Sequence, residues 1–260
     1  MSKKINIAII QTSINWEDPQ RNLDKYDNII NSINPEVDII FFPEMFNTGF
    51  SMNVKKIAET MDGNTVSWLR QVALTKKLSV VASLAIEENK NFYNRLVWIF
   101  SNGEITFYDK RHTFTLAGES KVYTKGKAKR IIKYKGWKFL PQICYDLRFP
   151  VWSRNDSGYD VLFYLANWPT PRISHWKNLL ISRAIENMSY CIGVNIVGSD
   201  PENKYNGYSS IIDPNGKHCV EMTEDETIIY YQLNKLKIID IRNSLNFLND
   251  KDDFTLKLNI

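Results

Sequence analysis

Apolar residues along the chain occur in two patterns, short continuous runs and runs with a spacing of three or four. Continuous runs bounded by polar residues are typical of buried strands, and the spaced pattern is typical of helices with one apolar face. The first part of the chain predicts strands over Ile5–Ile10, Val37–Phe42 and Leu78–Ile86. Helices are expected between them, one starting at Asp18-Pro19 and another capped by Asn64. This alternation indicates an α/β protein.

The middle of the chain changes to a hairpin pattern. Asn102-Gly103 lies between two apolar runs and favours the tight turn of an antiparallel hairpin. Lys135-Gly136 predicts a second hairpin. The four strands of these hairpins are expected over Phe92–Phe100, Ile105–Tyr108, Arg130–Tyr134 and Trp137–Cys144.

The last third returns to the alternating pattern, with a strand over Val161–Leu165, a helix over Ile173–Ser189 and a strand over Cys191–Val197. Tyr208–Ile212 and Glu221–Leu233 are expected to pair around the turn Asp213-Pro-Asn-Gly216 and to close the sheet. Parallel units mixed with hairpins predict a pair of mixed sheets covered by helices. The expected fold is an α/β layered sandwich, with residues 1–260 forming one domain.

Composition and charge narrow the possible classes. The 260 residues are 43% hydrophobic, enough for a large core, and no apolar stretch approaches the length of a membrane helix. The 33 basic and 29 acidic residues are spread along the chain, and the basic cluster Lys125–Arg130 is expected to be a solvated loop. We therefore expect a soluble cytoplasmic protein without a nucleic-acid or membrane partner.

The cysteines Cys144, Cys191 and Cys219 are widely scattered and show no CxxC spacing. This pattern fits neither a disulfide scaffold nor a zinc ribbon. Cys144 differs from the others because it ends a predicted strand, where open α/β sheets keep their active sites. By itself it is better explained as a buried core thiol, because free cysteine is among the most buried residue types.

Two further reactive side chains occupy comparable positions. Glu44 follows the apolar run Ile39–Phe42, and Lys110 ends a hairpin strand before an irregular stretch, His112–Tyr123. Each taken alone is more often a solvated surface residue. Apolar neighbours of Glu44 are expected to raise its proton affinity towards that of a general base, and Lys110 is expected to lower the pKa of Cys144. Together the three predict a nucleophile, a base and a cation.

These segments resemble the nitrilase, or carbon–nitrogen hydrolase, superfamily. The resemblance rests on Phe41–Phe50 (FFPEMFNTGF), Tyr108–His112 (YDKRH) and Ile143–Pro150 (ICYDLRFP), in that order, and extends over nearly the whole chain. It implies a four-layer αββα sandwich and a Glu-Lys-Cys triad that needs no metal or cofactor. Glu44 would be the general base, Lys110 the oxyanion-stabilising cation and Cys144 the nucleophile. Glu119 resembles the family's second glutamate, and a homodimer is the family expectation.

The residues after the cysteine narrow the resemblance to one branch. Cys144-Tyr-Asp146 is similar to the amidase branches, and the continuation to Arg154 is similar to the ω-amidases, which hydrolyse ω-amides of α-keto acids such as 2-oxoglutaramate and 2-oxosuccinamate. The backbone N–H of Tyr145 would be the second oxyanion donor. Substrate contacts are expected from cationic or hydrogen-bonding side chains and from aromatic walls; the candidates are Arg148, Arg172, His175, Phe46 and Trp168. For Arg148 a structural ion pair, and for the aromatic residues an ordinary core position, remain alternatives.

Three rival interpretations remain open at this point. A Cys-His hydrolase would use one of the three histidines, His112, His175 or His218, instead of Glu44. A related branch of the superfamily cleaves N-carbamoyl compounds and also releases carbon dioxide. The non-enzyme alternative is a catalytically silent binding protein on the same fold.

Overall fold

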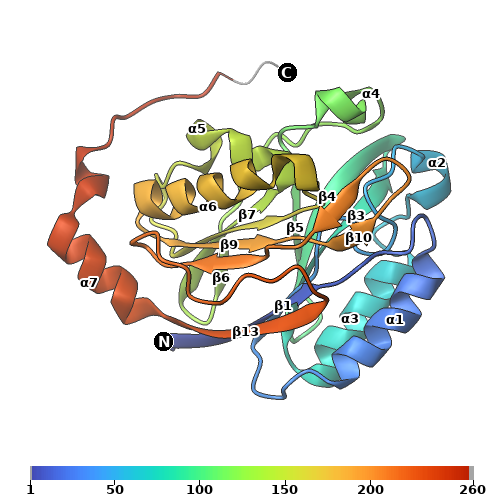
Figure 1. The fold of residues 1–260 in the computed structure, drawn as a ribbon, viewed down its shortest axis with the longest axis horizontal. Helices are drawn as coiled ribbons and strands as arrows, with labels where there is room; N and C mark the ends of the chain where they lie inside the picture. Colours follow the sequence, from blue (N-terminus) through green and yellow to red (C-terminus); the bar gives the residue numbers. More distant parts are fainter. Residues whose placement is uncertain (1, 258–260) are drawn as a thin grey trace.

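The computed structural model describes residues 2–257 and contains two mixed β-sheets (Figure 1). The first sheet comprises β1 (Lys4–Gln11), β2 (Ile39–Phe41), β3 (Ser79–Glu88), β4 (Asn91–Ile99), β5 (Ile105–Asp109) and β13 (Thr227–Asn234). The second comprises β6 (Ile132–Tyr134), β7 (Trp137–Ile143), β8 (Val161–Leu165), β9 (Tyr190–Val194) and β12 (Ser210–Ile212). The strand orders are β13-β1-β2-β3-β4-β5 and β12-β9-β8-β7-β6.

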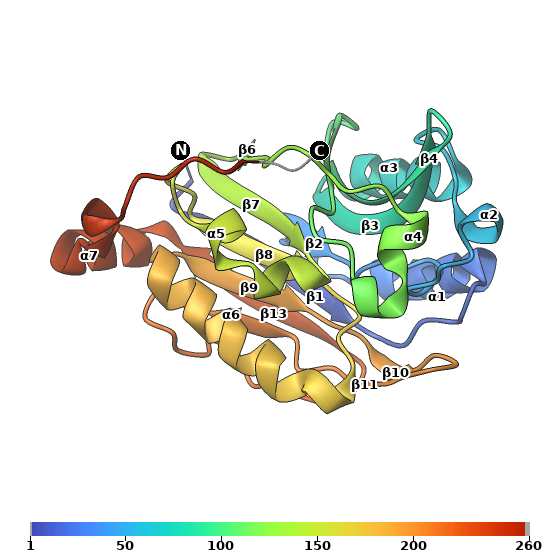
Figure 2. The same cartoon turned by 90° about the horizontal axis from the view of Figure 1, so that it is seen from above.

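Helices cover the outer faces of the sheets. The α-helices are α1 (Pro19–Asn31), α2 (Val54–Ile57), α3 (Asn64–Lys76), α4 (Glu119–Val122), α5 (Pro150–Ser153), α6 (Ile173–Asn187) and α7 (Lys235–Leu245). Helices α1 and α3 lie together against the first sheet, whereas α5 and α6 lie on the second (Figures 1 and 2). None of the helices in residues 2–257 is both long and apolar enough to cross a membrane.

The main hydrophobic core lies between the two sheets. Phe41 and Trp98 of the first sheet meet Phe139 and Phe163 of the second, and all four are fully buried. Each buried aromatic side chain contributes about 2–3 kcal/mol through its burial. Separate clusters join α1 and α3 to the first sheet and α6 to the second. The expected four-layer αββα sandwich is thus confirmed.

Local sequence signals explain most of the boundaries. The Asp18 carboxylate accepts a hydrogen bond from the Arg21 N–H and Pro19 begins α1, as expected. Asn64, the expected cap of α3, is instead its first residue, and Gly63 occupies the cap position. A Cβ at residue 63 would lie 2.2 Å from the Glu59 carboxylate, which itself accepts the Thr65 N–H. The Glu59 carboxylate therefore provides the side-chain acceptor at the start of α3 that was expected from Asn64.

Both hairpins of the middle region are confirmed. Strands β4 and β5 pair from Ile99–Ile105 to Arg95–Asp109, and Gly103 adopts the left-handed φ of 83° that the turn requires. Strands β6 and β7 pair around Lys135 and Gly136. The basic segment 125–130 precedes this hairpin, and its Lys125, Lys127 and Arg130 side chains are exposed, as expected for a solvated loop.

One expected pairing is wrong. β12 and β13 belong to different sheets: β12 pairs with β9, while β13 pairs antiparallel with β1 from Lys4–Asn234 to Gln11–Thr227. The turn at Asp213–Gly216 is therefore no hairpin between them, and the chain crosses from one sheet to the other after it. The expected strand Cys191–Val197 is also interrupted, since β9 ends at Val194 and β10 (Val197–Ser199) pairs with β11 (Lys204–Asn206).

The strand directions bring several chain segments to one edge. β2 runs parallel to its neighbours in the first sheet, and β7, β8 and β9 run parallel in the second. The segments that follow β2, β7 and β8 carry Glu44, Cys144 and Asn167, and hydrogen bonds join Glu44 to Asn167. Functional sites of α/β sheets lie at such carboxyl ends.

Candidate active site

Cys144 begins a sharp turn at the end of β7. Its φ is 40°, a left-handed conformation that non-glycine residues seldom adopt and that costs free energy unless the surroundings enforce it. A 3₁₀ helix, η2 (Cys144–Arg148), starts at this residue. Because the first N–H groups of a helix have no partner within it, the Tyr145 N–H is available beside the sulfur. The Cys144 side chain itself is half-buried and contacts the Asn167 carbonyl at 4.0 Å.

Glu44 follows β2 and is completely buried. Its Oε1 accepts hydrogen bonds from Lys110 Nζ and Asn94 Nδ2, both at 2.8 Å, and its Oε2 accepts the Asn167 N–H at 2.9 Å. Asn167 also donates from Nδ2 to the Glu44 carbonyl at 2.8 Å. Three hydrogen-bond donors therefore reach this buried carboxylate.

Lys110 follows β5 and lies between two carboxylates. Its side chain is buried, with Nζ 2.8 Å from Glu44 and 3.0 Å from Glu119 Oε1, and it lies 4.8 Å from the centre of the Phe50 ring. Burial lowers the pKa of Lys110, but the charges of Glu119 and Glu44 outweigh it and raise the pKa above the ordinary value. The ammonium is thus a fixed positive charge.

Glu119, at the start of α4, is the second buried carboxylate of the cluster. Oε1 accepts Lys110 Nζ and Asn94 Nδ2, and Oε2 accepts the Phe114 N–H. Burial raises the pKa of Glu119; Lys110 opposes this rise and Glu44 adds to it. The expected position of Glu119 next to the triad agrees with the structure, and the irregular stretch 112–123 contains two short helices that deliver it.

The thiol of Cys144 has a raised pKa. Burial raises the pKa of Cys144 well above its ordinary value, and the Glu44 charge raises it further. Lys110 lowers this pKa, as expected from the sequence, but its effect is smaller than that of burial. The thiol keeps its proton near neutral pH and needs a base to become a nucleophile.

Asn94 is a member of the cluster that sequence reasoning missed. It lies in the middle of β4, buried, and its amide bridges Glu44 and Glu119 while its Oδ1 accepts from Ser83 Oγ at 3.2 Å. Ser83 Oγ in turn accepts the Met45 N–H at 2.9 Å. The sequence did contain a signal: Asn94 stands close to the apolar run of β4. A buried amide there needs hydrogen-bond partners.

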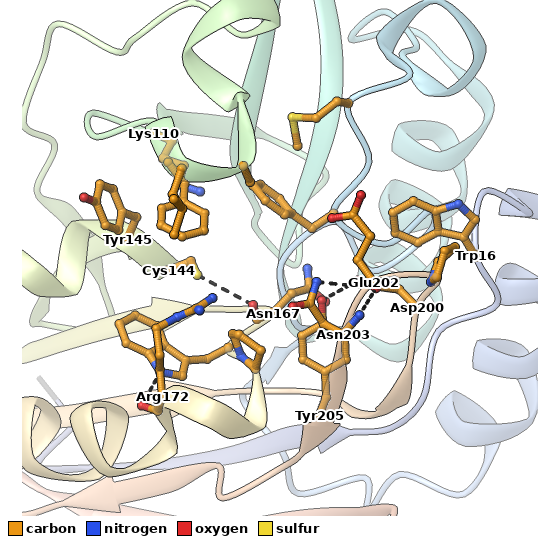
Figure 3. A pocket seen from close by; sticks show the side chains of 18 of the residues that line it. Trp16, Lys110, Cys144, Tyr145, Asn167, Arg172, Asp200, Glu202, Asn203 and Tyr205 are labelled. Carbon is orange, nitrogen blue, oxygen red and sulfur yellow. Dashed lines mark hydrogen bonds between the residues drawn. The ribbon is translucent and has the colours of Figure 1, made fainter.

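A cavity of about 430 Å³ opens beside the cysteine. Figure 3 shows Lys110, Cys144 and Tyr145 on one side of it and Trp16, Asp200 and Glu202 on the other. Arg148, Trp168 and Arg172 line it, as the sequence suggested; Trp16 and the tip of the β10–β11 hairpin, residues 200–203, were not anticipated.

Both arginines face this cavity without a carboxylate partner among the residues that the structure describes. Arg148 lies over the Trp168 ring at 4.8 Å, and its Nη2 is 3.2 Å from His175 Nδ1. Arg172 lies 5.5 Å from the centre of the Phe114 ring. Two guanidinium groups thus offer free donors near the thiol, whereas a structural ion pair for Arg148, the alternative considered above, is not formed.

Two of the expected substrate contacts are wrong. Phe46 does not line the cavity: it packs in the core against Tyr26, Phe42 and Trp68, because the chain turns sharply at Met45, where φ is 45°. His175 does not line it either. Its side chain is exposed on α6 and contacts the guanidinium of Arg148 from outside the cavity.

The histidines also bear on the Cys-His alternative. His112 binds the buried Asp146 through Nδ1, His175 binds Arg148, and His218 lies next to Ile212 beyond β12. None of the three lines the cavity that contains Cys144. Within residues 2–257, no group of three or more histidine, cysteine, aspartate or glutamate side chains has the arrangement of a metal site.

Known proteins resemble this chain over almost its full length. ω-Amidase YafV of Yersinia enterocolitica is 41% identical over 82% of this chain and 83% of its own, and 2-oxoglutaramate amidase of Bacillus subtilis is 33% identical over 95% and 97%. A CN-hydrolase superfamily protein of Xanthomonas campestris, whose crystal structure has an arsenic adduct in the active site, superposes with a TM-score of 0.95 at 35% identity, covering 99% of this chain and 100% of its own. The family described as carbon-nitrogen hydrolase matches residues 6–243, and the chain belongs to this family.

Proposed function

We propose that this protein is an ω-amidase that hydrolyses the terminal amide of small α-keto acid ω-amides, such as 2-oxoglutaramate and 2-oxosuccinamate, to the dicarboxylate and ammonia. One observation carries the proposal: Cys144, Lys110 and the guanidinium groups of Arg148 and Arg172, for which residues 2–257 provide no carboxylate partner, line the same cavity. A substrate with an amide at one end and a carboxylate at the other fits this distribution of charge. The names of the relatives from Yersinia and Bacillus support the same substrate class.

In the proposed first half-reaction, Glu44 accepts the proton of the Cys144 thiol and the sulfur attacks the amide carbon. The raised pKa of the thiol makes this base necessary. The C=O electron pair moves to oxygen, and the oxyanion is stabilised by Lys110 and by the Tyr145 N–H. As the tetrahedral intermediate collapses, the C–N bond breaks and Glu44 returns the proton to the leaving nitrogen, releasing ammonia.

In the second half-reaction, water hydrolyses the thioester. Glu44 removes a proton from the water, the resulting hydroxide adds to the thioester carbon, and the same donors stabilise the oxyanion. The C–S bond then breaks, and the sulfur regains a proton from Glu44. Glu119 is a second acceptor for the Lys110 ammonium beside Glu44, and the two carboxylates together fix its position next to the reacting carbonyl.

The triad is tested by the variants Glu44→Gln, Lys110→Ala and Cys144→Ala. Each is expected to lower the kcat for 2-oxoglutaramate at least a hundredfold, because each removes the base, an oxyanion donor or the nucleophile. Ammonia release and circular dichroism measure turnover and folding. Cys191→Ala, at a buried cysteine away from the cavity, serves as the control and should retain its kcat.

The substrate class is tested with 2-oxoglutaramate, 2-oxosuccinamate, glutamine, asparagine and a simple nitrile. The keto acid amides should give the highest kcat/KM. A preference for glutamine would contradict the ω-amidase assignment, and near-normal turnover by any one of the three triad variants would contradict the mechanism.

We also propose that residues 1–260 form one catalytic domain that acts in the cytoplasm as a homodimer. The free state of all three cysteines suits a reducing compartment. Val151 on α5 and Ile185 on α6 are apolar side chains that are 48% and 46% exposed, and each could contribute to a contact between two subunits. Light scattering after size exclusion measures the mass; a monomer at assay concentration would contradict the dimer.

A further inference from the structure

Asp146 is a buried carboxylate that the proposed reaction does not use. It lies in η2, two residues after Cys144, with no exposed surface, and it does not line the cavity. Its two oxygens nevertheless accept four hydrogen bonds. Oδ2 accepts the Ile143 N–H at 3.0 Å and the Tyr108 hydroxyl at 2.8 Å, and Oδ1 accepts the His112 N–H at 2.9 Å and contacts His112 Nδ1 at 2.8 Å.

These hydrogen bonds join the two segments that carry Lys110 and Cys144. Tyr108 and His112 stand two residues before and two residues after Lys110, and both bind the same carboxylate. On the other side, Asp146 holds the N–H of Ile143, the residue immediately before Cys144. Residues on both sides of Lys110 are therefore hydrogen-bonded to the turn that contains Cys144.

The Ile143 hydrogen bond also bears on the strain at Cys144. Pairing between β6 and β7 stops at Phe139, so the Ile143 N–H on that side has no strand partner. Asp146 supplies the missing acceptor from the third position of η2, which is one half of a capping box. Without it, a buried N–H would remain unpaired next to a residue with a φ of 40°.

The Tyr108 hydroxyl takes part in three hydrogen bonds. It accepts hydrogen bonds from Trp152 Nε1 at 3.0 Å and from the Arg111 N–H at 3.2 Å while donating to Asp146. Burial, together with the charge of Asp146, raises the pKa of Tyr108 well above its ordinary value, so the hydroxyl keeps its proton. The direction of the hydrogen bond to Asp146 is thereby set.

His112 offers the carboxylate a ring as well as a donor. The imidazole stacks on Phe149 with centroids 3.7 Å apart and an angle of 8° between the planes. Phe149 contacts Tyr145, and Tyr145 contacts Phe114 of the cavity wall. The ring and the donor can therefore be separated by mutation, since asparagine places its Nδ2 where histidine has Nδ1, and phenylalanine keeps a planar ring.

We propose that Asp146 is a positioning residue. Through its hydrogen bonds to Tyr108 and His112, it sets the distance between the oxyanion-binding ammonium of Lys110 and the sulfur of Cys144. The carboxylate acts through these contacts and touches no reacting atom. A displacement of about 1 Å between groups that act on one transition state costs about a hundredfold in rate. Arg148 also belongs to η2, but its guanidinium is held by the Trp168 ring and His175, and Arg172 follows β8, so we expect substrate binding to change less than the rate of the chemical step.

The deciding experiment compares His112→Phe with His112→Asn and rests on the proposed function for its kinetic arm. Both variants keep the backbone N–H that donates to Asp146 Oδ1. His112→Phe keeps the stack on Phe149 and removes the side-chain donor to Asp146, whereas His112→Asn keeps a side-chain donor and removes the stack. We expect His112→Phe to lower kcat about tenfold or more with KM changed less than twofold, and His112→Asn to retain kcat within about threefold. Thermal unfolding should not follow this order, because the stack contributes to stability.

Tyr108→Phe removes a donor from the other oxygen and should lower kcat in the same way. Tyr190→Phe is its matched control, because Tyr190 is a buried tyrosine whose hydroxyl binds the Asn234 backbone away from the cavity. It should leave kcat unchanged. If His112→Asn loses as much kcat as His112→Phe, or if His112→Phe retains it, the positioning role is overturned and His112 serves packing alone.

A second measurement separates this inference from the proposed function. The rate at which iodoacetamide alkylates Cys144, read by mass spectrometry with Cys191 as the internal reference, needs no substrate. It should differ from the wild type at least threefold in His112→Phe and less than twofold in His112→Asn. If the wild type hydrolyses no keto acid amide but this order holds, the proposed substrate is wrong and the positioning role stands; equal rates in the two variants overturn the positioning role.

Discussion

At the scale of single residues, Arg148 and Arg172 differ in what supports them. Arg148 is held between the Trp168 ring and His175, whereas Arg172 follows the loop after β8 and leans on Phe114. A guanidinium fixed on an aromatic face loses little conformational freedom when it binds a carboxylate. Both are therefore suited to bind the α-carboxylate of the proposed substrate.

Replacing either arginine by methionine should raise the KM for 2-oxoglutaramate about tenfold to a hundredfold, because a hydrogen bond to a charged group contributes about 1.5–3 kcal/mol. The kcat should change less than threefold. His175→Ala should have a smaller effect on KM, since it only removes the support of Arg148. Steady-state kinetics measures both constants, and an aliphatic amide without a carboxylate is the control substrate. Equal losses with the control substrate would contradict carboxylate binding.

The sequence alone identified Glu44, Lys110 and Cys144 as neighbours, and the structure brings Glu44 and Lys110 into direct contact and places Lys110 and Cys144 in one cavity. It could not identify Asn94, whose partners come from β2 and α4, or the direction of Phe46, which depends on the turn at Met45. Side-chain direction after a turn and hydrogen bonds between distant segments depend on tertiary packing, which no local pattern encodes.

At the scale of elements, Glu226 ties the start of β13 to the loop after β1. It accepts the Ser13 N–H and Lys25 Nζ, each at 2.8 Å. Burial opposes ionisation, but the hydrogen bonds from Lys25 and Ser13 outweigh it and lower the pKa of Glu226 from 4.5 to about 2. A carboxyl whose pKa is lower in the folded state stabilises the fold above its unfolded pKa and loses this contribution as the pH falls.

Glu226→Gln should therefore lower the free energy of unfolding at pH 7 by about 1 kcal/mol, a value limited by solvent screening of this half-exposed pair. The difference from the wild type should shrink between pH 4.5 and about 2, the interval between the unfolded and folded pKa values. Urea denaturation at several pH values measures it. Glu221→Gln, at an exposed glutamate before the same strand, is the control; a difference that grows as the pH falls would contradict the assignment.

Element boundaries followed the sequence where the signal was local. The Asp18 cap and the Asn102-Gly103 turn involve residues at most a few positions apart, and both are found where expected. The cap of α3 differs because its acceptor is Glu59, six residues before Thr65, which is held in place by a bridge to Ile86 of β3. This bridge joins segments 27 residues apart, so the position of the Glu59 carboxylate depends on tertiary structure.

At the scale of the whole molecule, β12 and β13 show why the sequence could not predict which strands pair with each other. The turn between them looks like a hairpin turn, and both strands carry apolar residues. The actual partners are β9 and β1, the latter more than 200 residues away along the chain. The antiparallel pairing of β13 with β1 extends over eight residues. It is more stable than a short local hairpin, because it supplies hydrogen-bond partners to the edge of β1 that does not pair with β2.

Asn167 gives the two-sheet architecture a measurable consequence. It follows β8 of the second sheet, yet its backbone N–H and side-chain amide both hold Glu44, which follows β2 of the first. In a molten globule, which keeps secondary structure but loses fixed packing, the sheets would no longer be docked and the base would lose this orientation. Turnover therefore reports whether the two sheets are docked. During urea denaturation at constant pH, turnover should disappear together with the near-ultraviolet circular dichroism, and not with the far-ultraviolet signal of the strands and helices.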